Sequence, residues 1–189
     1  MVASKTIGIV YFSGTGTTRA LAEHVQRGVN DAGATPSMVE IVGTDIVEGR
    51  WSNDSLAGNL DGCDALIFGS PTYMGCVSAQ LKSFFDAMAP RWYTQAWNGK
   101  FAGAFTASSL AAGDKLNCLQ DISSFAMQMG MIWVGTGNKI GDNKNTNGFY
   151  LGVGATASSA AELTESDTST AEHLGQRVAL FTQQQTTVG

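Results

Sequence analysis

The sequence predicts an α/β protein with a doubly wound parallel sheet of five strands and helices on both faces. Short apolar stretches recur five times along the 189 residues, and segments with helical periodicity alternate with them. Parallel neighbours need crossover connections, and helical crossovers cover both faces of the sheet. We expect the strand order 2-1-3-4-5, which places a ligand between the carboxyl ends of the first and third strands.

The expected strands are short runs rich in apolar, β-branched or aromatic residues: 6–12, 37–42, 65–69, 101–106 and 131–136. A first helix is expected after residue 18, because Leu21, Val25 and Val29 repeat at every fourth position. It should end near Gly33. Further helices are expected over three stretches with similar periodicity: 77–88, 116–125 and 174–181.

The remaining segments are predicted to be irregular. Residues 43–62 are acidic and polar and predict a surface excursion, in which Trp51 is expected to be a packing anchor. Residues 137–156 are rich in Gly and Asn and predict a long loop. The C-terminal QQQTTVG, residues 183–189, is expected to fray.

Composition and charge narrow the function classes. A hydrophobic content of 43% over 189 residues fits one domain covering residues 1–189. The net charge of −5 argues against a nucleic-acid surface, and no membrane span is expected. Because residues 1–5 hold no apolar targeting segment, we expect a cytoplasmic protein. Cys63, Cys76 and Cys118 form no metal-binding pattern and are expected to be reduced thiols.

The loop after the first strand carries two glycines and four hydroxyl groups, from Ser13, Gly14, Thr15, Gly16, Thr17 and Thr18. A glycine turn exposes successive backbone N–H groups, and the following helix adds the positive end of its dipole. Such a loop can bind a terminal phosphate without a lysine. The alternative is an ordinary strand-to-helix turn with Thr17 or Thr18 as the N-cap.

Other chemistries that use this kind of sheet lack their required residues. No Gly-Lys-Ser or Gly-Lys-Thr occurs for a nucleoside triphosphate, and Arg19 occupies the third glycine position of a dinucleotide loop. A phosphorylated receiver domain needs carboxylates where Ser13 and Ser70 stand. Cys76 is followed six residues later by Lys82, whereas a cysteine phosphatase needs an arginine there. No Gly-x-Ser-x-Gly motif of a hydrolase is present.

Two sets of motifs resemble those of known flavoproteins. Ser13-x-Thr15-Gly16-x-Thr18 resembles the phosphate loop of flavodoxin-like FMN proteins. The run SPTYMG at 70–75, with SAQLK at 78–82 and Phe85-Asp86 after it, is similar to the tryptophan-repressor-binding-protein (WrbA-type) family of NAD(P)H:quinone oxidoreductases. Trp92, seven residues before Gly99-Lys100, falls where that family places a tryptophan beside the flavin. The resemblance covers residues 6–156.

The resemblance implies a flavodoxin-like fold and an FMN-dependent enzyme that transfers two electrons from NAD(P)H to a quinone by a ping-pong mechanism. Because the flavin carries the chemistry, no catalytic side chain and no metal are expected. The resemblance also implies a homodimer or a homotetramer. The cofactor-binding residues that we expect are Ser13, Gly14, Thr15, Gly16, Thr17, Thr18, Pro71, Thr72, Tyr73, Met74, Gly75, Trp92, Ala107, Ser108 and Ser109.

This chain departs from the family at three places. Tyr73-Met74 replaces the usual Arg-Phe, residues 107–113 (ASSLAAG) replace a Gly-rich run, and Met129 aligns with a histidine near the flavin. The chain's own histidines, His24 and His173, lie on expected helices and are predicted to be surface residues.

The rival interpretation is a flavodoxin-type electron carrier without a substrate of its own. Residues 91–144, which should supply most of the rim of the site, contain five basic and three acidic residues. A neutral or basic rim favours the anionic phosphates of NAD(P)H over a basic redox partner.

Overall fold

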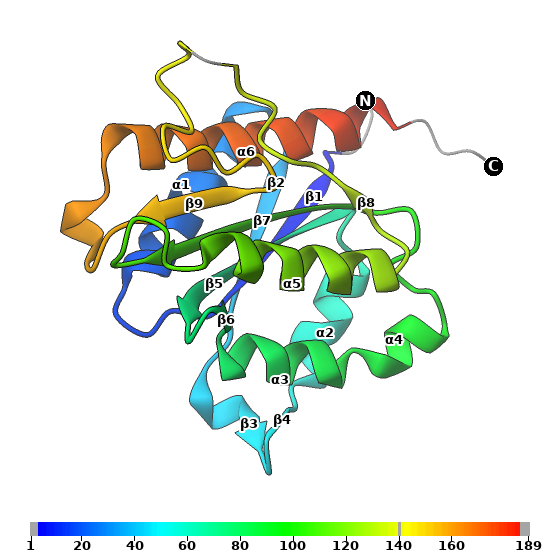
Figure 1. Ribbon diagram of the computed structural model, residues 1–189. Helices are drawn as coiled ribbons and strands as arrows, with labels where there is room; N and C mark the ends of the chain where they lie inside the picture. The colour runs from blue at the N-terminus through cyan, green and yellow to red at the C-terminus, as the bar shows by residue number, and fades with distance from the viewer. Residues whose placement is uncertain (1–3, 140, 186–189) are drawn as a thin grey trace.

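A parallel sheet with the order β2-β1-β5-β7-β8 forms the centre of the protein (Figure 1). The computed structural model describes residues 4–139 and 141–185. The parallel strands of the sheet are β1 (Thr6–Tyr11), β2 (Thr35–Glu40), β5 (Ala65–Tyr73), β7 (Phe101–Ser108), β8 (Ile132–Trp133) and β9 (Val153–Thr156). Strand β9 also pairs with β7 in parallel. The predicted order 2-1-3-4-5 is confirmed.

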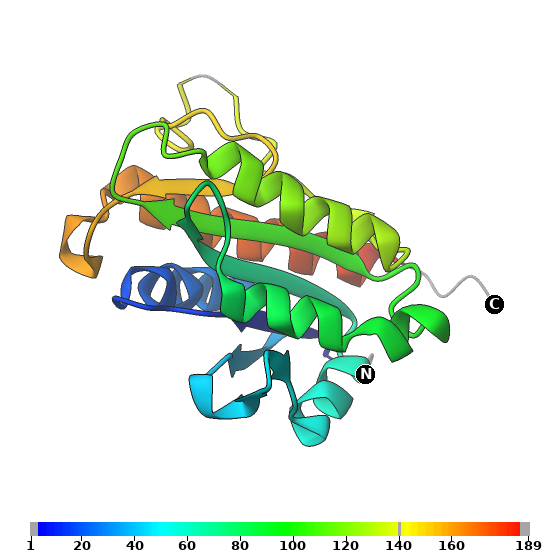
Figure 2. The ribbon, with the colours of Figure 1, turned by 60° about the horizontal axis from the view of Figure 1, so that its bottom comes forward.

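Helices cover both faces of the sheet (Figure 2). On one face α1 (Thr17–Asp31) and α6 (Glu165–Gln184) enclose a cluster that includes Ile9 and Leu174. On the other face α3 (Ala79–Ala87) and α5 (Lys115–Gln128) cover a second cluster that includes Val10 and Phe68. Neighbouring residues Ile9 and Val10 serve opposite faces because side chains alternate along a strand. The short helices α2 (Asp54–Asp61) and α4 (Ala89–Tyr93) complete this side.

Aromatic rings hold α3 and α5 against the sheet. Phe85 stacks on Phe125 with ring centroids 3.8 Å apart, and Phe68 meets Phe125 edge-on at 5.6 Å. Trp51 is buried and lies edge-on to Phe84 at 5.1 Å. The prediction that Trp51 is a packing anchor is confirmed, and this contact ties the irregular segment 43–62 to α3.

Helices α1 and α6 approach each other so closely that only glycine fits at the crossing. A Cβ atom on Gly28 would overlap the carbonyl oxygen of Glu172, and one on Gly175 would overlap the carbonyl oxygen of Val25. Next to the crossing, His24 Nδ1 lies 2.8 Å from a carboxylate oxygen of Glu172. The two backbones are therefore in direct contact.

Several expected boundaries differ in the structure. Strand β2 begins two residues earlier than expected, β5 continues through residues 70–73, and β7 includes Ala107 and Ser108. Residues 43–62 are not wholly irregular, since they form β3 (Ile46–Val47), β4 (Arg50–Trp51) and α2. Asn53 caps α2 by accepting the N–H of Leu56, a local signal that the polar composition concealed.

The fifth strand position is divided between two segments. Strand β8 pairs with Phe101 and Ala102, whereas β9 pairs with residues 105–108. The chain leaves the sheet after β8, passes through a Gly/Asn-rich excursion and returns at Val153. The prediction of a loop over 137–156 was thus wrong at its end, where residues 153–156 (VGAT) form β9. The local sequence VGAT favours a strand only weakly, and pairing with β7 determines its structure.

The C-terminal helix extends further than expected. Gln183 and Gln184 belong to α6, and residues 186–189 of the tail expected to fray lie outside the described residues. No helix in the described ranges is long and apolar enough to cross a membrane.

We expect Gly28→Ala to destabilise the fold. The added methyl group must push α1 and α6 apart, and overpacking of this kind costs about 1–3 kcal/mol. Gly58→Ala is the matched control, because Gly58 is also helical, in α2, and has nothing within 4 Å of an added Cβ. That control should be neutral or stabilising by up to about 1 kcal/mol. Urea unfolding of both variants checks the prediction, and equal stabilities would contradict it.

Candidate functional site

The loop between β1 and α1 presents backbone donors at a helix N-terminus. Gly16 is the N-cap, with φ of 94°, and the first turn of α1 holds no acidic residue. The hydroxyl of Ser13 accepts the N–H groups of Gly16 at 3.1 Å and Arg19 at 3.2 Å. The alternative of a turn capped by Thr17 or Thr18 is wrong, because both residues lie inside the helix and are buried.

In this loop and the first turn of α1, the N–H groups of Gly14, Thr15, Thr17 and Thr18 have no hydrogen-bond partner among the described residues. Free N–H groups at a helix N-terminus bind anions, and the helix dipole adds to the attraction. The first loop therefore fits a phosphate group, and it needs no cation from a side chain to do so.

The second loop is a tight hairpin that extends the central strand. Strand β5 turns at Met74 and Gly75, both with positive φ, into β6 (Cys76–Val77). Two central residues with positive φ are typical of a type I′ turn. Tyr73 and Met74 are exposed at its tip, while Thr72 is buried and shares a 2.8 Å hydrogen bond with Thr106 of β7.

The first and second loops touch each other at Tyr73. A Cβ atom on Gly14 would overlap the hydroxyl of Tyr73. The tyrosine side chain can lie against the first loop only because position 14 is glycine. This contact explains why position 14 of the phosphate loop is a glycine. The need for exposed backbone N–H groups did not by itself require a glycine there.

The third loop connects β7 to α5. The end of this loop and the first turns of α5 contact the hairpin and hold it in place. Asp114 has a positive φ, and its Cβ lies 3.6 Å from where a Cβ on Gly75 would be. Asn117 Nδ2 donates to the carbonyl of Gly75 at 2.8 Å, and Asp121 accepts the N–H of Val77 at 3.2 Å. Sequence reasoning missed Asn117 and Asp121. Their signal was a polar i, i+4 pair near the start of a helix that follows a strand.

The structure brings fourteen of the fifteen expected site residues to the carboxyl ends of β1, β5 and β7, which are neighbours in the sheet. Trp92 is the exception, because it lies on α4, beyond the opposite end of α3 from the hairpin (Figures 1 and 2). There it is exposed and lines a groove between α3 and α5. Within one chain, Trp92 is not beside the three loops.

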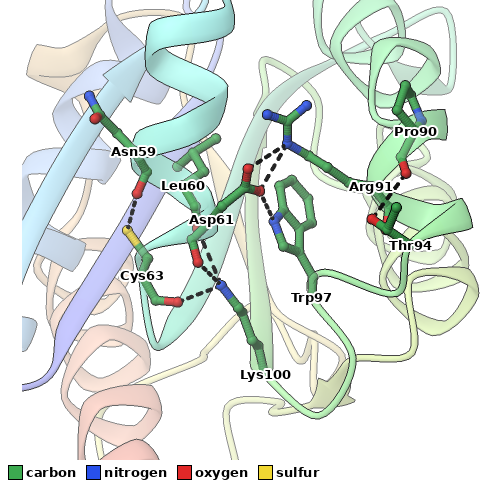
Figure 3. Close-up of polar contacts among 9 residues, drawn as sticks. All are labelled: Asn59, Leu60, Asp61, Cys63, Pro90, Arg91, Thr94, Trp97 and Lys100. Carbon is green, nitrogen blue, oxygen red and sulfur yellow. Dashed lines mark hydrogen bonds and ion pairs between the residues drawn. The ribbon is translucent and has the colours of Figure 1, made fainter.

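The Gly99-Lys100 motif that accompanied Trp92 has a structural role (Figure 3). Lys100 Nζ donates to the carbonyl oxygens of Asp61 and Cys63 at 2.7 Å and so satisfies the C-terminal end of α2. The carboxylate of Asp61 accepts bonds from Arg91 Nε at 2.9 Å and Trp97 Nε1 at 2.8 Å. These bonds anchor the segment that follows α3. Burial lowers the pKa of Lys100.

These contacts contradict the charge count from which a neutral or basic rim was expected over residues 91–144. Arg91 and Lys100 are engaged with α2, next to the amino end of β7, and Lys115 is fully buried. Three of the five basic residues therefore do not face an incoming ligand. The number of basic and acidic residues in 91–144 therefore does not distinguish an enzyme that binds NAD(P)H from an electron carrier.

Neither histidine contacts the three loops, and neither is a simple surface residue. His24 is half-buried against Glu172 of α6, and Nε2 of His173 lies 2.9 Å from the carbonyl oxygen of Thr136. Burial lowers the pKa of His173. Met129, at the position of the family histidine, is a buried core residue at the end of α5.

Comparisons with known proteins agree with this architecture. The family model described as NADPH-dependent FMN reductase matches residues 7–146. The crystal structure of the flavodoxin, WrbA-like protein from Agrobacterium tumefaciens is similar, with a TM-score of 0.78 and 36% identity over 97% of this chain and 100% of that chain. An archaeal flavodoxin with 17% identity and a TM-score of 0.64 shares the fold, over 94% of this chain and 99% of that one.

Two curated relatives are similar over about two thirds of the chain. Flavodoxin FldP of Pseudomonas aeruginosa is 38% identical over 130 residues, which is 68% of this chain and 65% of that protein. An NAD(P)H dehydrogenase (quinone) of Rhodopseudomonas palustris is 30% identical over 136 residues, 67% of this chain and 68% of that protein. The chain thus spans slightly less than two thirds of the length of FldP.

We expect Lys100→Met to destabilise the protein by about 1–3 kcal/mol, because carbonyl groups at the end of α2, among them the part-buried one of Cys63, lose a charged donor. Lys82→Met is the control, since Lys82 forms an exposed i, i+4 pair with Asp86 that contributes about 0.3–0.5 kcal/mol. Urea unfolding measures both changes. A Lys100→Met protein as stable as the control would show that the bonds in Figure 3 contribute little.

Proposed function

Since the chain belongs to the NADPH-dependent FMN reductase family, we propose that it is a single FMN-binding domain over residues 1–189 that passes two electrons from NAD(P)H to a quinone. The cofactor FMN and the electron donor NAD(P)H, expected from the sequence, agree with this family. The observation that carries the proposal is the set of free N–H donors in residues 14–18, at the N-terminus of α1 and next to the hairpin.

The residues at this edge fit FMN in two parts. The N–H groups of Gly14, Thr15, Thr17 and Thr18 would hold the phosphate, with the hydroxyls of Thr15 and Thr18 as further donors. The hairpin at 71–75 and residues 107–109, where β7 ends and the third loop begins, would lie against the ring. When bound, the flavin would carry the electron pair, and the protein would orient the flavin and set the electrostatic environment of its ring.

Trp92 supports a homodimer or homotetramer as part of the proposal. It is exposed and distant from the loops of its own chain, so it would reach a flavin only from a second copy. Light scattering of the purified protein tests this, and a monomer would leave Trp92 without a role at the site. A cytoplasmic location also remains a proposal.

A flavodoxin-type electron carrier is the second candidate. The similarity to Flavodoxin FldP favours it, whereas the similarity to quinone dehydrogenases favours the enzyme. The two candidates differ in whether NAD(P)H itself reduces the bound flavin.

We expect Thr15→Ala and Thr18→Ala to weaken FMN binding about ten- to a hundredfold, because each removes a donor close to a charged phosphate. Riboflavin, which has no phosphate, should bind these variants almost as it binds the unaltered chain. Quenching of flavin fluorescence measures both affinities. Thr94→Ala, at the exposed C-cap residue of α4, is the control. Equal losses for the two ligands would mean that the loop is only structural.

We expect ping-pong kinetics, with parallel double-reciprocal lines, because nicotinamide and quinone would use the same open face of the ring in turn. The rate should show no steep change near pH 6.5, since His24 and His173 do not contact the loops. Stopped-flow mixing with NAD(P)H and a small quinone measures both. If dithionite reduces the bound flavin and NAD(P)H does not do so within seconds, the carrier is the correct assignment.

A further inference from the structure

Lys115 is the first residue of α5, and its side chain is 0% exposed. Its Nζ donates to the carbonyl oxygen of Leu110 at 3.0 Å and to the hydroxyl of Thr156 at 2.6 Å. The same nitrogen lies 5.5 Å from the centre of the Phe149 ring. The ammonium group therefore joins the third loop to β9, directly beneath the edge that carries the proposed site.

The charge of Lys115 is not neutralised at close range. Across residues 4–139 and 141–185, none of the ion pairs within 4.0 Å involves Lys115. Burial lowers the pKa of Lys115, and the more distant Asp167 partly opposes this effect. Burial of a charge without a partner of opposite sign costs free energy that an apolar side chain of similar length would avoid. A site that keeps such a charge is a candidate for a functional role of the charge.

The conformation of the third loop depends on the Leu110 carbonyl. This oxygen accepts from Lys115 and also from the hydroxyl of Ser108 at 2.9 Å. The N–H of Ala111 belongs to the same peptide and points the opposite way, away from Lys115. Among the described residues, no partner is recorded for the N–H groups of 110–114. The loop thus offers free N–H donors, and the hydrogen bond from Lys115 to the Leu110 carbonyl sets the direction in which the N–H of Ala111 points.

We propose that Lys115 is a positioning residue for the flavin ring, an inference that rests on the proposed FMN function. By joining Leu110 to Thr156, it holds the third loop in one conformation next to the hairpin. It also leaves a positive charge below the loop. Such a charge favours the reduced, anionic form of a flavin over the oxidised form.

The test compares Lys115→Met, Lys115→Arg, Thr156→Val and the control Lys82→Met. Affinities for FMN and riboflavin come from fluorescence quenching, and the midpoint potential of bound FMN from equilibration with a reference dye. Lys115→Met should weaken both ligands about tenfold, because the ring contacts rather than the phosphate contacts are lost. It should also lower the potential by about 30 mV, which is a tenfold change in the affinity ratio of reduced to oxidised flavin.

The other variants separate the charge from the loop contact. Lys115→Arg keeps the charge and should retain the potential. Thr156→Val keeps the lysine but removes one bond, so it should weaken both ligands with little change in potential. In the ligand-free protein, amide hydrogen exchange of Lys115 and Ala157, whose N–H groups donate to the carbonyl oxygens of Ala112 and Ser108, should become faster in Thr156→Val. This readout does not depend on the flavin. Lys82→Met should change none of these quantities.

The outcomes distinguish this inference from the proposed function. If the unaltered chain does not bind FMN, both are lost. If it binds FMN and Lys115→Met retains the same affinities and the same potential, the role of Lys115 is overturned while the function stands. Unchanged hydrogen exchange in Thr156→Val would also overturn it, even if Lys115→Met fails to fold.

Discussion

The hydrogen-bond ladders that β5 forms with β1 on one side and β7 on the other determine where the three loops of the site lie. Ile7–Tyr11 pair with residues 65–69, and residues 65–71 pair with 101–107. Strand β5 is buried along residues 65–72, so both its faces are fixed by packing. Because β5 continues beyond the end of β1, the hairpin projects over the first loop, and Tyr73 reaches Gly14. A shift of one residue in either ladder would turn every side chain of β5 to the opposite face.

The half-buried Lys100 and the buried Lys115 show that a lysine can bind backbone oxygens either at a helix end or in a loop. Lys100 satisfies the carbonyl groups at the end of α2, whereas Lys115 at the start of α5 reaches back to a carbonyl group of the preceding loop. Backbone oxygens, which carry partial negative charge, are the partners of Lys100, whereas Lys115 binds one backbone oxygen and the hydroxyl of Thr156. The positive charge near the proposed flavin ring therefore comes from below the third loop, whereas the sequence count had placed it on the rim.

The sequence predicted the parts of the fold that depend on periodicity and on adjacent signals. The strand order followed from alternating apolar runs and helical stretches, and the first loop followed from glycines and hydroxyls between a strand and a helix. Strand β9 could not be predicted, because VGAT is a strand only when β7 pairs with it. The place of Trp92 also depends on how α3 and α4 run across the sheet, which no local pattern specifies. The contacts of Asn117 and Lys115 link segments that only the folded chain brings together.

The division of the fifth strand position has a consequence for contact between molecules. A sheet edge with a long row of free N–H and C=O groups is a template on which another chain can add a strand. Here one edge is filled by β8 and β9, of two and four residues, with the excursion between them. The other edge is β2, which contains Pro36 and so lacks one donor. Neither edge presents a long uninterrupted row of backbone donors and acceptors. The short strands β8 and β9 protect one edge from strand addition, and Pro36 protects the other.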